Sequence, residues 1–324
     1  MFTTKELLEK VNQYIANWNY SRQPQGLYSP IEYVLSLGGK RLRPVLMLMA
    51  YNLYKDNVDA VLPSAVGLET YHNYTLLHDD LMDRADMRRN KPTVHKVWND
   101  NTAILSGDTM LVLAYQQMTL SETKHLKEVL DIFNKTALEI GEGQQYDMEF
   151  ETRGDVTEDE YIEMIRLKTS VLLAAALKIG AVLGGASSED ADRLYEYGIQ
   201  LGLAFQLQDD YLDVYGNEAQ FGKKIGGDIL CNKKTYMLIN AMQRANNEQR
   251  DELKRWIEAQ EYNPTDKIQA VTALYDAIGI RELCDKKIAY YFDCAERILA
   301  QVQVDDERKK TLRGYAASLV HRTV

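Results

Sequence analysis

Residues 60–83 read AVLPSAVGLETYHNYTLLHDDLMD, an apolar stretch that ends in a group of aspartates. Its apolar residues recur three and four positions apart, which is the spacing of a helix that packs against a core. The same period begins near the N-terminus, where Leu7, Val11 and Ile15 share one face, and strand alternation is nearly absent. It predicts further helices over 5–18, 31–37, 44–55, 101–119, 125–150, 158–184, 188–214, 233–247, 249–259, 264–278 and 280–301.

Turn signals separate these segments, at Gly38-Gly39, 89–92, Gly184-Gly185, Gly226-Gly227 and Asn263-Pro264. The 324 residues include 19 Gly and 6 Pro, a small share that favours long helices. We find neither a composition break nor a linker, so we predict one all-α domain over residues 1–324 with ten or more helices. A helical repeat array is the weaker alternative.

Composition excludes several classes of protein. The 38 Lys+Arg against 48 Asp+Glu give a net charge of −10, whereas proteins that bind nucleic acids are typically basic. Three scattered cysteines fit a reduced, cytoplasmic protein better than a disulfide framework or a zinc site. The N-terminus turns polar at once, without the apolar core of a signal peptide. The longest apolar run, 171–186, contains Lys178 and is shorter than the roughly 20 residues that span a bilayer, so we expect a soluble protein without an integral membrane segment.

Two acidic clusters have the same DDxxD spacing and follow apolar helical segments. The first is Asp79, Asp80 and Asp83, and the second is Asp209, Asp210 and Asp213. Two carboxylates four residues apart on a helix repel each other and destabilise it. A cation bound between them would turn this repulsion into attraction. A solvated helix end is the simpler explanation for one such cluster, but its repetition favours Mg²⁺, which is commonly held by one or two carboxylates and substrate phosphates. The rival calcium site of the EF-hand type lacks its DxDxDG order.

Basic residues near these clusters agree with a substrate that carries a polyphosphate. The segment GGKRLRP (38–44) places cations around a glycine turn, suited to phosphate oxygens. Arg88 and Arg89 follow the first cluster, and four lysines at 223, 224, 233 and 234 follow the second. Each alone could be an ordinary surface cation. His72 lies two helical turns before Asp79, roughly 10 Å along the same face, although a histidine there is equally a core residue.

The ordered motifs resemble the trans-type isoprenyl diphosphate synthases, or polyprenyl synthetases. The resemblance covers nearly the whole chain, and its motifs are GGKRLRP (38–44), DDLMD (79–83), RRN (88–90), GEGQQYD (141–147), KTS (168–170), FQLQDDYLD (205–213), FGKKIGGD (221–228) and KKTY (233–236). It implies a single-domain helical bundle around a central cavity, the isoprenoid synthase type I fold, usually as a homodimer. It also implies Mg²⁺-dependent, head-to-tail condensation of isopentenyl diphosphate with an allylic diphosphate.

Site residues follow from the resemblance, position by position. It implies two or three Mg²⁺ ions per site, with Asp79, Asp83 and Asp209 as ligands and Asp80, Asp210 and Asp213 supporting them. The expected isopentenyl diphosphate pocket consists of Lys40, Arg43, His72 and Arg89. The expected clamp on the allylic diphosphate consists of Arg88, Lys168, Thr169, Gln206, Lys223 and Lys233, where Lys234 could replace Lys233. Arg88, Lys168 and the six aspartates are the predicted catalytic residues.

Product length should depend on the residues below Asp79. Tyr74 and Tyr71 lie five and eight residues before it, and core packing is the alternative role for both. In the family that this chain resembles, an aromatic residue five positions before the first aspartate motif is typical of short-chain enzymes. DDLMD also lacks the two extra residues usual in the bacterial farnesyl type. We therefore expect geranylgeranyl diphosphate, with farnesyl diphosphate as the next candidate.

Two other enzymatic functions and one non-enzymatic role remain as alternatives. A class I terpene cyclase would share the fold and the first aspartate cluster, but it would normally carry an NDxxSxxxE-like second motif. A metal phosphohydrolase of the HD type would use His72, His78 and Asp79, which leaves the second cluster unexplained. A regulatory subunit of a heteromeric prenyl synthase would tend to lose the aspartate motifs, and both are intact here.

Overall fold

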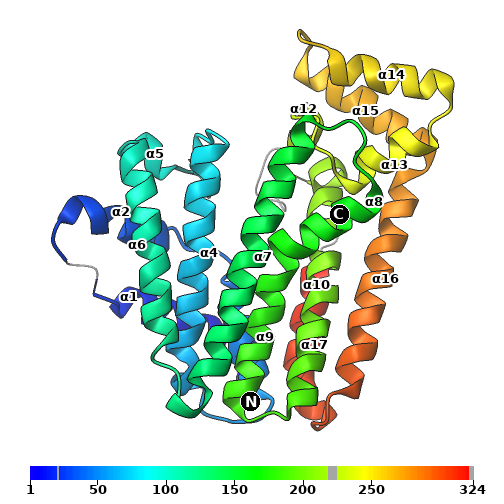
Figure 1. The fold of residues 1–324 in the computed structure, drawn as a ribbon. Coiled ribbons are helices and arrows are strands. Elements are labelled where there is room, and N and C mark those ends of the chain that lie inside the picture. Colours follow the sequence, from blue (N-terminus) through cyan, green and yellow to red (C-terminus); the bar gives the residue numbers. More distant parts are fainter. Residues whose placement is uncertain (20–21, 218–224, 321–324) are drawn as a thin grey trace. The chain divides into compact units, whose positions relative to one another are not determined.

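Helices make up most of the computed structural model, which describes residues 1–19, 22–217 and 225–320 (Figure 1). The chain forms two compact units, each built from separate stretches of sequence. Unit 1 contains Met1–Asn134, Ala175–Leu194 and Val302–Leu312. Unit 2 contains Lys135–Ala174, Tyr195–Gln301 and the chain from Arg313 onward. The all-α fold class is confirmed, and the single domain over 1–324 stays a prediction.

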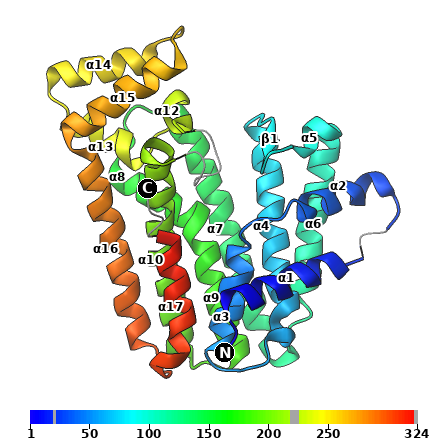
Figure 2. The same ribbon diagram turned by 180° about the vertical axis from the view of Figure 1, so that it is seen from behind.

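Unit 1 is centred on α4, the helix that carries the first acidic cluster. Its core is formed where α4 packs against α3 and α6, and α1 crosses α4 in Figure 2. A two-stranded antiparallel hairpin follows α4. The elements of unit 1 are α1 (Thr4–Asn17), α2 (Gln25–Ser36), α3 (Leu42–Asn52), η1 (Val58–Val61), α4 (Leu62–Met82), β1 (Met87–Arg88), β2 (Lys91–Pro92), α5 (Val94–Val97), α6 (Asp100–Met118) and η2 (Thr123–His125).

Unit 2 carries the second acidic cluster, at the end of α10. Within it, α13 packs against α8, α15 and α16, and α12 packs against α15. The helices of unit 2 are α8 (Glu158–Ile165), the π-helix η3 (Arg166–Ser170), α12 (Gly227–Leu230), α13 (Tyr236–Arg244), α14 (Asn247–Glu258), α15 (Pro264–Ile278) and α16 (Ile280–Gln301). Each unit takes part of α7 (Leu126–Thr152), α9 (Val171–Gly184), α10 (Ser188–Tyr215) and α17 (Asp306–Val320).

Local sequence explains several helix ends. Thr157 begins α8 with a capping box, because its hydroxyl accepts the Glu160 N–H while the Glu160 side chain accepts the Thr157 N–H. Asn263 is the N-cap of α15, and Pro264 is the first residue of the helix, a position where its missing N–H costs no hydrogen bond. Gly279 ends α15 with φ 82°, the left-handed conformation in which glycine is favoured.

Several segments differ from the sequence prediction, among them α5 and α12, which it did not include. The expected helix over 158–184 is interrupted by the π-helix, and α2 starts at Gln25 rather than at residue 31. The helix α17 was not predicted, because its buried apolar face is sparse and consists of Leu312, Ala316, Leu319 and Val320.

The stretch Glu158–Gly184 is long and apolar enough to cross a membrane, and it exceeds the apolar run expected from sequence. However, 83% of its most apolar 18-residue window is buried within the structure. Burial of this kind is typical of a core helix, since such a helix is apolar on all sides.

Candidate active site

A glycine turn at residues 38–41 leads into α3 in unit 1. Gly38 and Gly39 have φ values of 74° and 127°, which favour glycine. A Cβ atom on Gly39 would lie 2.8 Å from Cζ of Arg89, so glycine allows the guanidinium to approach the backbone. Arg89 there donates a hydrogen bond to the Gly38 carbonyl. The turn therefore holds one predicted cation next to the segment that carries Lys40 and Arg43.

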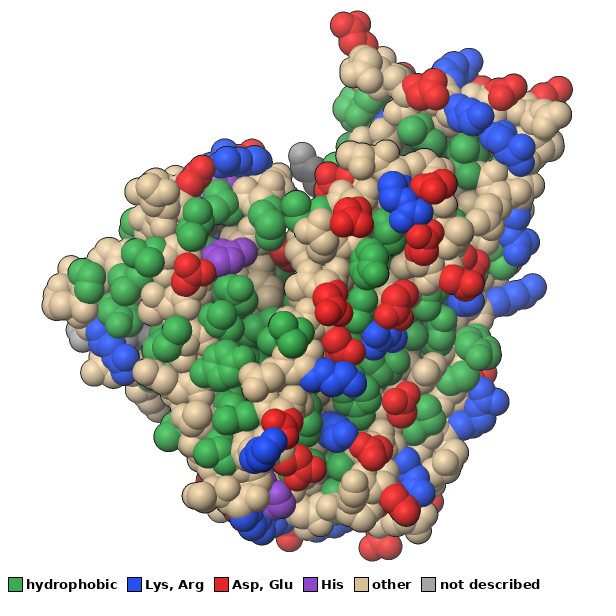
Figure 3. All heavy atoms as spheres, in the orientation of Figure 1, with side chains coloured by type: hydrophobic (Ala, Val, Ile, Leu, Met, Phe, Trp, Pro, Cys, Tyr) green, Lys and Arg blue, Asp and Glu red, His purple; other side chains and the backbone are tan. Residues whose placement is uncertain are grey.

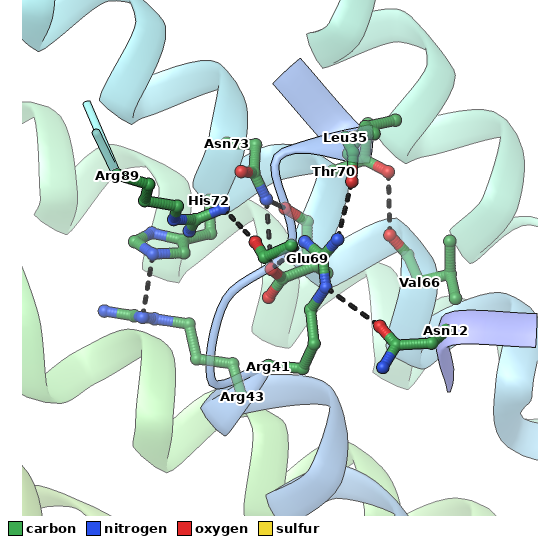
Figure 4. Close-up of polar contacts among 11 residues, drawn as sticks. Asn12, Leu35, Arg41, Arg43, Val66, Glu69, Thr70, His72, Asn73 and Arg89 are labelled. Carbon is green, nitrogen blue, oxygen red and sulfur yellow. Dashed lines mark hydrogen bonds and ion pairs between the residues drawn. The ribbon is translucent and has the colours of Figure 1, made fainter. Parts of the chain in front are cut away.

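Arg43 and His72 meet in the same part of unit 1 (Figure 4). Nη1 of Arg43 lies 3.0 Å from Nε2 of His72. Because a guanidinium can only donate, Nε2 must accept, and the neutral imidazole carries its proton on Nδ1. Burial lowers the pKa of His72 well below its usual value, and nearby Arg43 and Arg89 lower it further. This histidine is thus a neutral member of a cationic cluster.

The first acidic cluster lies at the C-terminal end of α4. Asp80 is buried and binds Arg88, whose Nη2 lies 2.6 Å from Oδ1 and whose Nε lies 2.9 Å from the same oxygen. Asp79 is partly exposed, and Asp83 is an exposed residue at the helix C-cap. Asp80 and Arg88 therefore hold each other, whereas Asp79 and Asp83 present carboxylates at the surface of unit 1.

The two tyrosines predicted to set product length form an aromatic stack. Tyr71 is only 3% exposed, and its ring centroid lies 5.5 Å from that of Tyr74 and 5.2 Å from that of Phe133. Tyr74 is partly exposed and packs against His78, with ring centroids 4.9 Å apart. Tyr74 is thus the outer ring of the stack, and Tyr71 supports it from within unit 1.

In unit 2, the middle aspartate of the second cluster is buried. Tyr161 donates a hydrogen bond to Oδ2 of Asp210, and Nε2 of Gln206 lies 3.0 Å from its Oδ1. Burial raises the pKa of Asp210 to about 7, and the charge of Asp228 acts in the same direction. Both carboxylate oxygens of Asp210 are therefore engaged inside unit 2, while Asp209 is partly exposed.

Asp213, the third aspartate of this cluster, holds the chain that follows α10. Its Oδ2 accepts the backbone N–H of Asp228 at 2.9 Å, and its carbonyl accepts the N–H of Gly226. These contacts place a carboxylate at the N-terminal end of α12, where the helix dipole favours negative charge. Asp213 thus has a local structural role in addition to the supporting role predicted for it.

The π-helix Arg166–Ser170 presents Lys168 and Thr169. It is closely approached by two glycines, since a Cβ on Gly143 would lie 2.4 Å from the Lys168 nitrogen and one on Gly202 would lie 2.6 Å from Cα of Ser170. Oγ1 of Thr169 lies 3.1 Å from Oε1 of Gln206. A π-turn of this kind is frequently found at functional sites.

Asp147 joins two of the predicted lysines. Its Oδ2 lies 2.6 Å from Nζ of Lys168 and 3.9 Å from Nζ of Lys233. Burial raises the pKa of Asp147, but the two lysines outweigh this effect and hold the pKa below its usual value. Lys234 instead donates to the carbonyl of Asn232 at 3.4 Å. This geometry favours Lys233 over Lys234 as the second cation of the cluster.

The structure thus brings most predicted residues together within their own unit. Lys40 is an exposed residue of the glycine turn, and Lys223 lies outside the described residues. Sequence reasoning missed three contributors, namely Glu69, Asp147 and Tyr161. Asp147 could have been found, because it ends the quoted GEGQQYD segment, whereas no sequence pattern marks Glu69 or Tyr161.

The carboxylates offer suitable donors for a hard divalent cation. Among residues 1–19, 22–217 and 225–320, no three His, Cys, Asp or Glu side chains gather as a complete metal site. Asp79 and Asp83 in unit 1 and Asp209 in unit 2 nevertheless present the oxygen ligands that Mg²⁺ prefers. Within its own unit, each of these carboxylates has the chemistry to bind Mg²⁺ together with substrate phosphates.

Each unit therefore places aspartates at the C-terminal end of a long helix, close in sequence or space to lysines or arginines. The negative end of a helix dipole disfavours carboxylates, and the described last turns of α4 and α10 contain no basic side chain. Such helix ends suit a metal-complexed anion. An all-helical fold with these helix ends is consistent with the class of enzymes that the sequence motifs imply, those that act on diphosphate esters.

Comparisons with known proteins identify the family within this class. The profile described as polyprenyl synthetase matches residues 24–275. Geranylgeranyl diphosphate synthase of Methanosarcina mazei is 47% identical over 224 residues, 68% of this chain and 69% of that protein. Geranylfarnesyl diphosphate synthase of Aeropyrum pernix is 34% identical over 96% of this chain and 99% of that protein. A crystal structure of a geranylgeranyl pyrophosphate synthase is 40% identical, covers 100% of both chains and has a TM-score of 0.95.

The chain belongs to the polyprenyl synthetase family. It is accordingly a short-chain trans-prenyltransferase, as the sequence motifs predicted. The family acts on isopentenyl diphosphate and an allylic diphosphate and requires a divalent metal. Neither the terpene cyclase nor the HD-type phosphohydrolase agrees with this membership, and Nε2 of His72 is directed at Arg43.

Proposed function

We propose that this enzyme uses Mg²⁺ to condense isopentenyl diphosphate head-to-tail with an allylic diphosphate, and that geranylgeranyl diphosphate is its product. The observation that carries the proposal is the end of α4, where Asp79 and Asp83 stand at the negative end of the helix without a basic residue in the described last turn. A cation offsets both the mutual repulsion of these carboxylates and the helix dipole.

Asp79, Asp83 and Asp209 would hold two or three Mg²⁺ ions against the allylic diphosphate. When bound, Mg²⁺ would stabilise the negative charge that grows on the leaving diphosphate. Support for this set comes from exposure, because Asp80, Asp210 and Asp213 are buried and engaged by other groups, whereas these three are at least partly exposed. The buried aspartates would act by supporting their neighbours.

Lys168 and Lys233 of unit 2 would stabilise the allylic diphosphate. They share the carboxylate of Asp147, which holds the two ammonium groups close to each other. Thr169 and Gln206 would orient the same group through their hydroxyl and amide. Arg88 and Lys223 complete the predicted clamp. Preorganised donors of this kind lower the barrier to breaking the carbon–oxygen bond.

Lys40, Arg43 and Arg89 would bind the diphosphate of isopentenyl diphosphate, with His72 as a neutral neighbour. Arginine suits this task because its planar fork matches phosphate oxygens. Holding the isopentenyl double bond next to the allylic carbon makes the condensation effectively unimolecular, which supplies several kcal/mol of the barrier reduction, about 7 or more at best. Loss of a proton then gives a chain five carbons longer.

Product length would be limited by Tyr74, backed by Tyr71 and Phe133. The Tyr71 ring packs edge to face on Phe133 and is tilted against Tyr74. Aromatic rings packed in this way resist displacement, which suits the floor of a pocket for an isoprenoid tail. The relative named for geranylgeranyl diphosphate supports this product, and the relative named for geranylfarnesyl diphosphate makes that longer chain a second candidate. Farnesyl diphosphate is the shorter candidate.

We also infer a homodimer located in the cytoplasm. Figure 3 shows hydrophobic side chains gathered over α6 in unit 1. Its outer face includes Leu105 and Val112, which are 59% and 57% exposed, together with Ile104 at 46%. Contiguous exposed apolar residues of this kind mark association surfaces. Light scattering should give twice the mass of one chain, and Leu105→Glu combined with Val112→Glu should give the mass of one chain.

Incubation with isopentenyl diphosphate, Mg²⁺ and, separately, dimethylallyl, geranyl or farnesyl diphosphate tests the proposal. Mass analysis of the dephosphorylated products should show a C20 alcohol that disappears when EDTA replaces Mg²⁺. A C15 product would support the proposed reaction but would show that the product is farnesyl and not geranylgeranyl diphosphate. Cyclic hydrocarbons, or no consumption of isopentenyl diphosphate, would contradict the proposed reaction.

A further inference from the structure

Arg41 differs from the other cations of the segment GGKRLRP because its side chain is buried. It is 4% exposed, whereas Lys40 is exposed and Arg43 is partly exposed. Figure 4 shows Arg43 extending to His72 while Arg41 points to Glu69. The middle cation of this segment therefore faces the interior of unit 1 and does not take part in the predicted diphosphate pocket.

Glu69 of α4 is the ionic partner of Arg41. Nη1 of Arg41 lies 2.9 Å from Oε1 of Glu69, and the two side chains are each 2% exposed. Nη2 of Arg41 donates to the Leu35 carbonyl at 2.6 Å, and its Nε contacts Oδ1 of Asn12 at 3.4 Å. Nδ2 of Asn73 adds a second donor to Oε1 of Glu69 at 3.1 Å. A buried ion pair with these additional hydrogen bonds is strongly directional.

The backbone of Arg41 explains why such an anchor is needed. Its φ and ψ of 47° and 39° lie in the left-handed region, which a residue with a side chain adopts only at a cost. The surrounding contacts must therefore hold this conformation. Because Arg41 stands between Lys40 and Arg43, its backbone sets the direction in which both leave the turn.

The ion pair also connects the turn to other members of the pocket. Glu69 lies three residues before His72 on α4, so the helix that bears the histidine is the one that holds Arg41. Arg89 donates to the carbonyl of Gly38 in the same turn. Burial lowers the pKa of Arg89, and the charge of Glu69 opposes this effect. Glu69 thus offsets part of the repulsion among the arginines of the pocket.

We infer that Arg41 and Glu69 are positioning residues for isopentenyl diphosphate. Their buried ion pair locks the left-handed turn against α4 and so fixes Lys40, Arg43, His72 and Arg89 in one arrangement, without either residue touching the substrate. This inference rests on the proposed function of that pocket. It assigns a specific role to two residues that are otherwise ordinary members of the core.

Glu69→Gln tests the role, because the amide keeps the size and one acceptor but removes the charge. We expect the Kd and the KM for isopentenyl diphosphate to rise about tenfold, while the KM for the allylic diphosphate changes by less than about twofold. Arg41→Lys, which keeps the charge but loses the fork, should show the same split between the two substrates. This second variant serves if Glu69→Gln fails to fold.

Asp190→Asn is the matched control. Asp190 is also a buried carboxylate of unit 1, but it pairs with Arg193 at 2.8 Å and accepts the backbone N–H of Gln303. Its variant should lower the melting temperature and leave the Kd for isopentenyl diphosphate unchanged. Calorimetry with isopentenyl diphosphate alone measures the Kd, and steady-state kinetics measures both KM values.

The possible results distinguish the positioning role of Arg41 and Glu69 from the proposed function of the enzyme. If Glu69→Gln lowers the melting temperature but keeps the wild-type Kd, or raises both KM values equally, the pair is only structural and the inference fails. Failure of the wild-type protein to bind isopentenyl diphosphate would overturn the proposed function and the inference together. Condensation activity with a selective change in the isopentenyl diphosphate constants supports both.

Discussion

The buried hydroxyl of Tyr161 on α8 donates a hydrogen bond to the carboxylate of Asp210 on α10. Tyr161 is 1% exposed and Asp210 is 5% exposed, so water cannot readily replace this bond. Asp210 in turn accepts from Gln206, whose amide oxygen accepts from Thr169. A residue outside every recognised motif thus supports three predicted site residues of unit 2.

Tyr161→Phe removes this hydroxyl without changing the shape of the core. We expect a loss in the free energy of unfolding of about 1–3 kcal/mol, because a buried acceptor loses its donor. The KM for the allylic diphosphate should rise about three- to tenfold as Gln206 and Thr169 lose their fixed orientation. Denaturant unfolding and steady-state kinetics measure the two effects.

Tyr197→Phe is the control for this variant. Tyr197 is equally buried, but its hydroxyl has no hydrogen-bond partner among the described residues. Its removal should leave both stability and KM near wild type. Equal effects of the two variants would contradict a role for the Tyr161–Asp210 bond.

His72→Gln should change the pH dependence of stability. The folded state holds His72 neutral with a lowered pKa, whereas the unfolded chain takes up a proton near pH 6.5. As the pH falls below about 6.5, the free energy of unfolding of the wild type should therefore decrease relative to that of the variant, by up to about 1.4 kcal/mol per pH unit. Above that pH, the difference between the two proteins should stay constant. Unfolding free energies from pH 7.5 to 5.5 test this, with His125→Gln, a change at a partly exposed histidine 3.8 Å from Glu128, for comparison. A difference that does not change with pH would show that His72 is not held neutral.

Asp79→Ala should reduce turnover by about a hundredfold or more, since it removes a predicted metal ligand that acts on the leaving group. The fold should survive, because Asp79 is partly exposed at a helix end where its charge is unfavourable. Circular dichroism and initial rates over a range of Mg²⁺ concentrations are the measurements. Asp131→Ala, which removes an exposed carboxylate paired with Lys127, should match the wild type. Wild-type turnover in Asp79→Ala would remove its metal role.

Tyr74→Ala should extend the product by one or more five-carbon units, because it removes the outer ring of the aromatic stack. A further Tyr71→Ala change should extend it again, since Tyr71 lies directly behind Tyr74. Mass analysis of the products gives the chain length, and Tyr290→Ala, which changes an exposed tyrosine, is the control. An unchanged product in both stack variants would exclude these residues as the limit on length.

Gly143→Ala should disturb the π-helix that presents Lys168 and Thr169. Its new Cβ would lie 2.4 Å from the Lys168 nitrogen, so we expect a loss of about 1–3 kcal/mol in stability and a higher KM for the allylic diphosphate. Gly141→Ala on the same helix has no described atom within 4 Å of the new Cβ and should gain up to about 1 kcal/mol. Unfolding curves and kinetics of the two variants decide the matter, and similar behaviour of the pair would contradict close packing at Gly143.

Periodicity was enough to predict most helices and the position of both acidic clusters at helix ends. It failed where the apolar face is sparse, as in α17, and where a helix changes its winding, as in Arg166–Ser170. A π-turn inserts a residue without changing which residue types are apolar, so the sequence pattern continues through it. Gly143 and Gly202 become informative only when the opposing backbone is known.

Residue type and spacing by themselves determined that this chain is all-helical, that it carries two aspartate clusters at helix ends and that cations accompany them in sequence. These properties depend on neighbours along one helix or turn. Only the tertiary structure decided which charges are available. It pairs Asp80 with Arg88, buries Asp210 beneath Tyr161, which is 49 residues away in sequence, and turns Arg41 inward to Glu69. Contacts between distant segments depend on how helices pack, and burial then fixes which carboxylates and cations stay exposed to solvent.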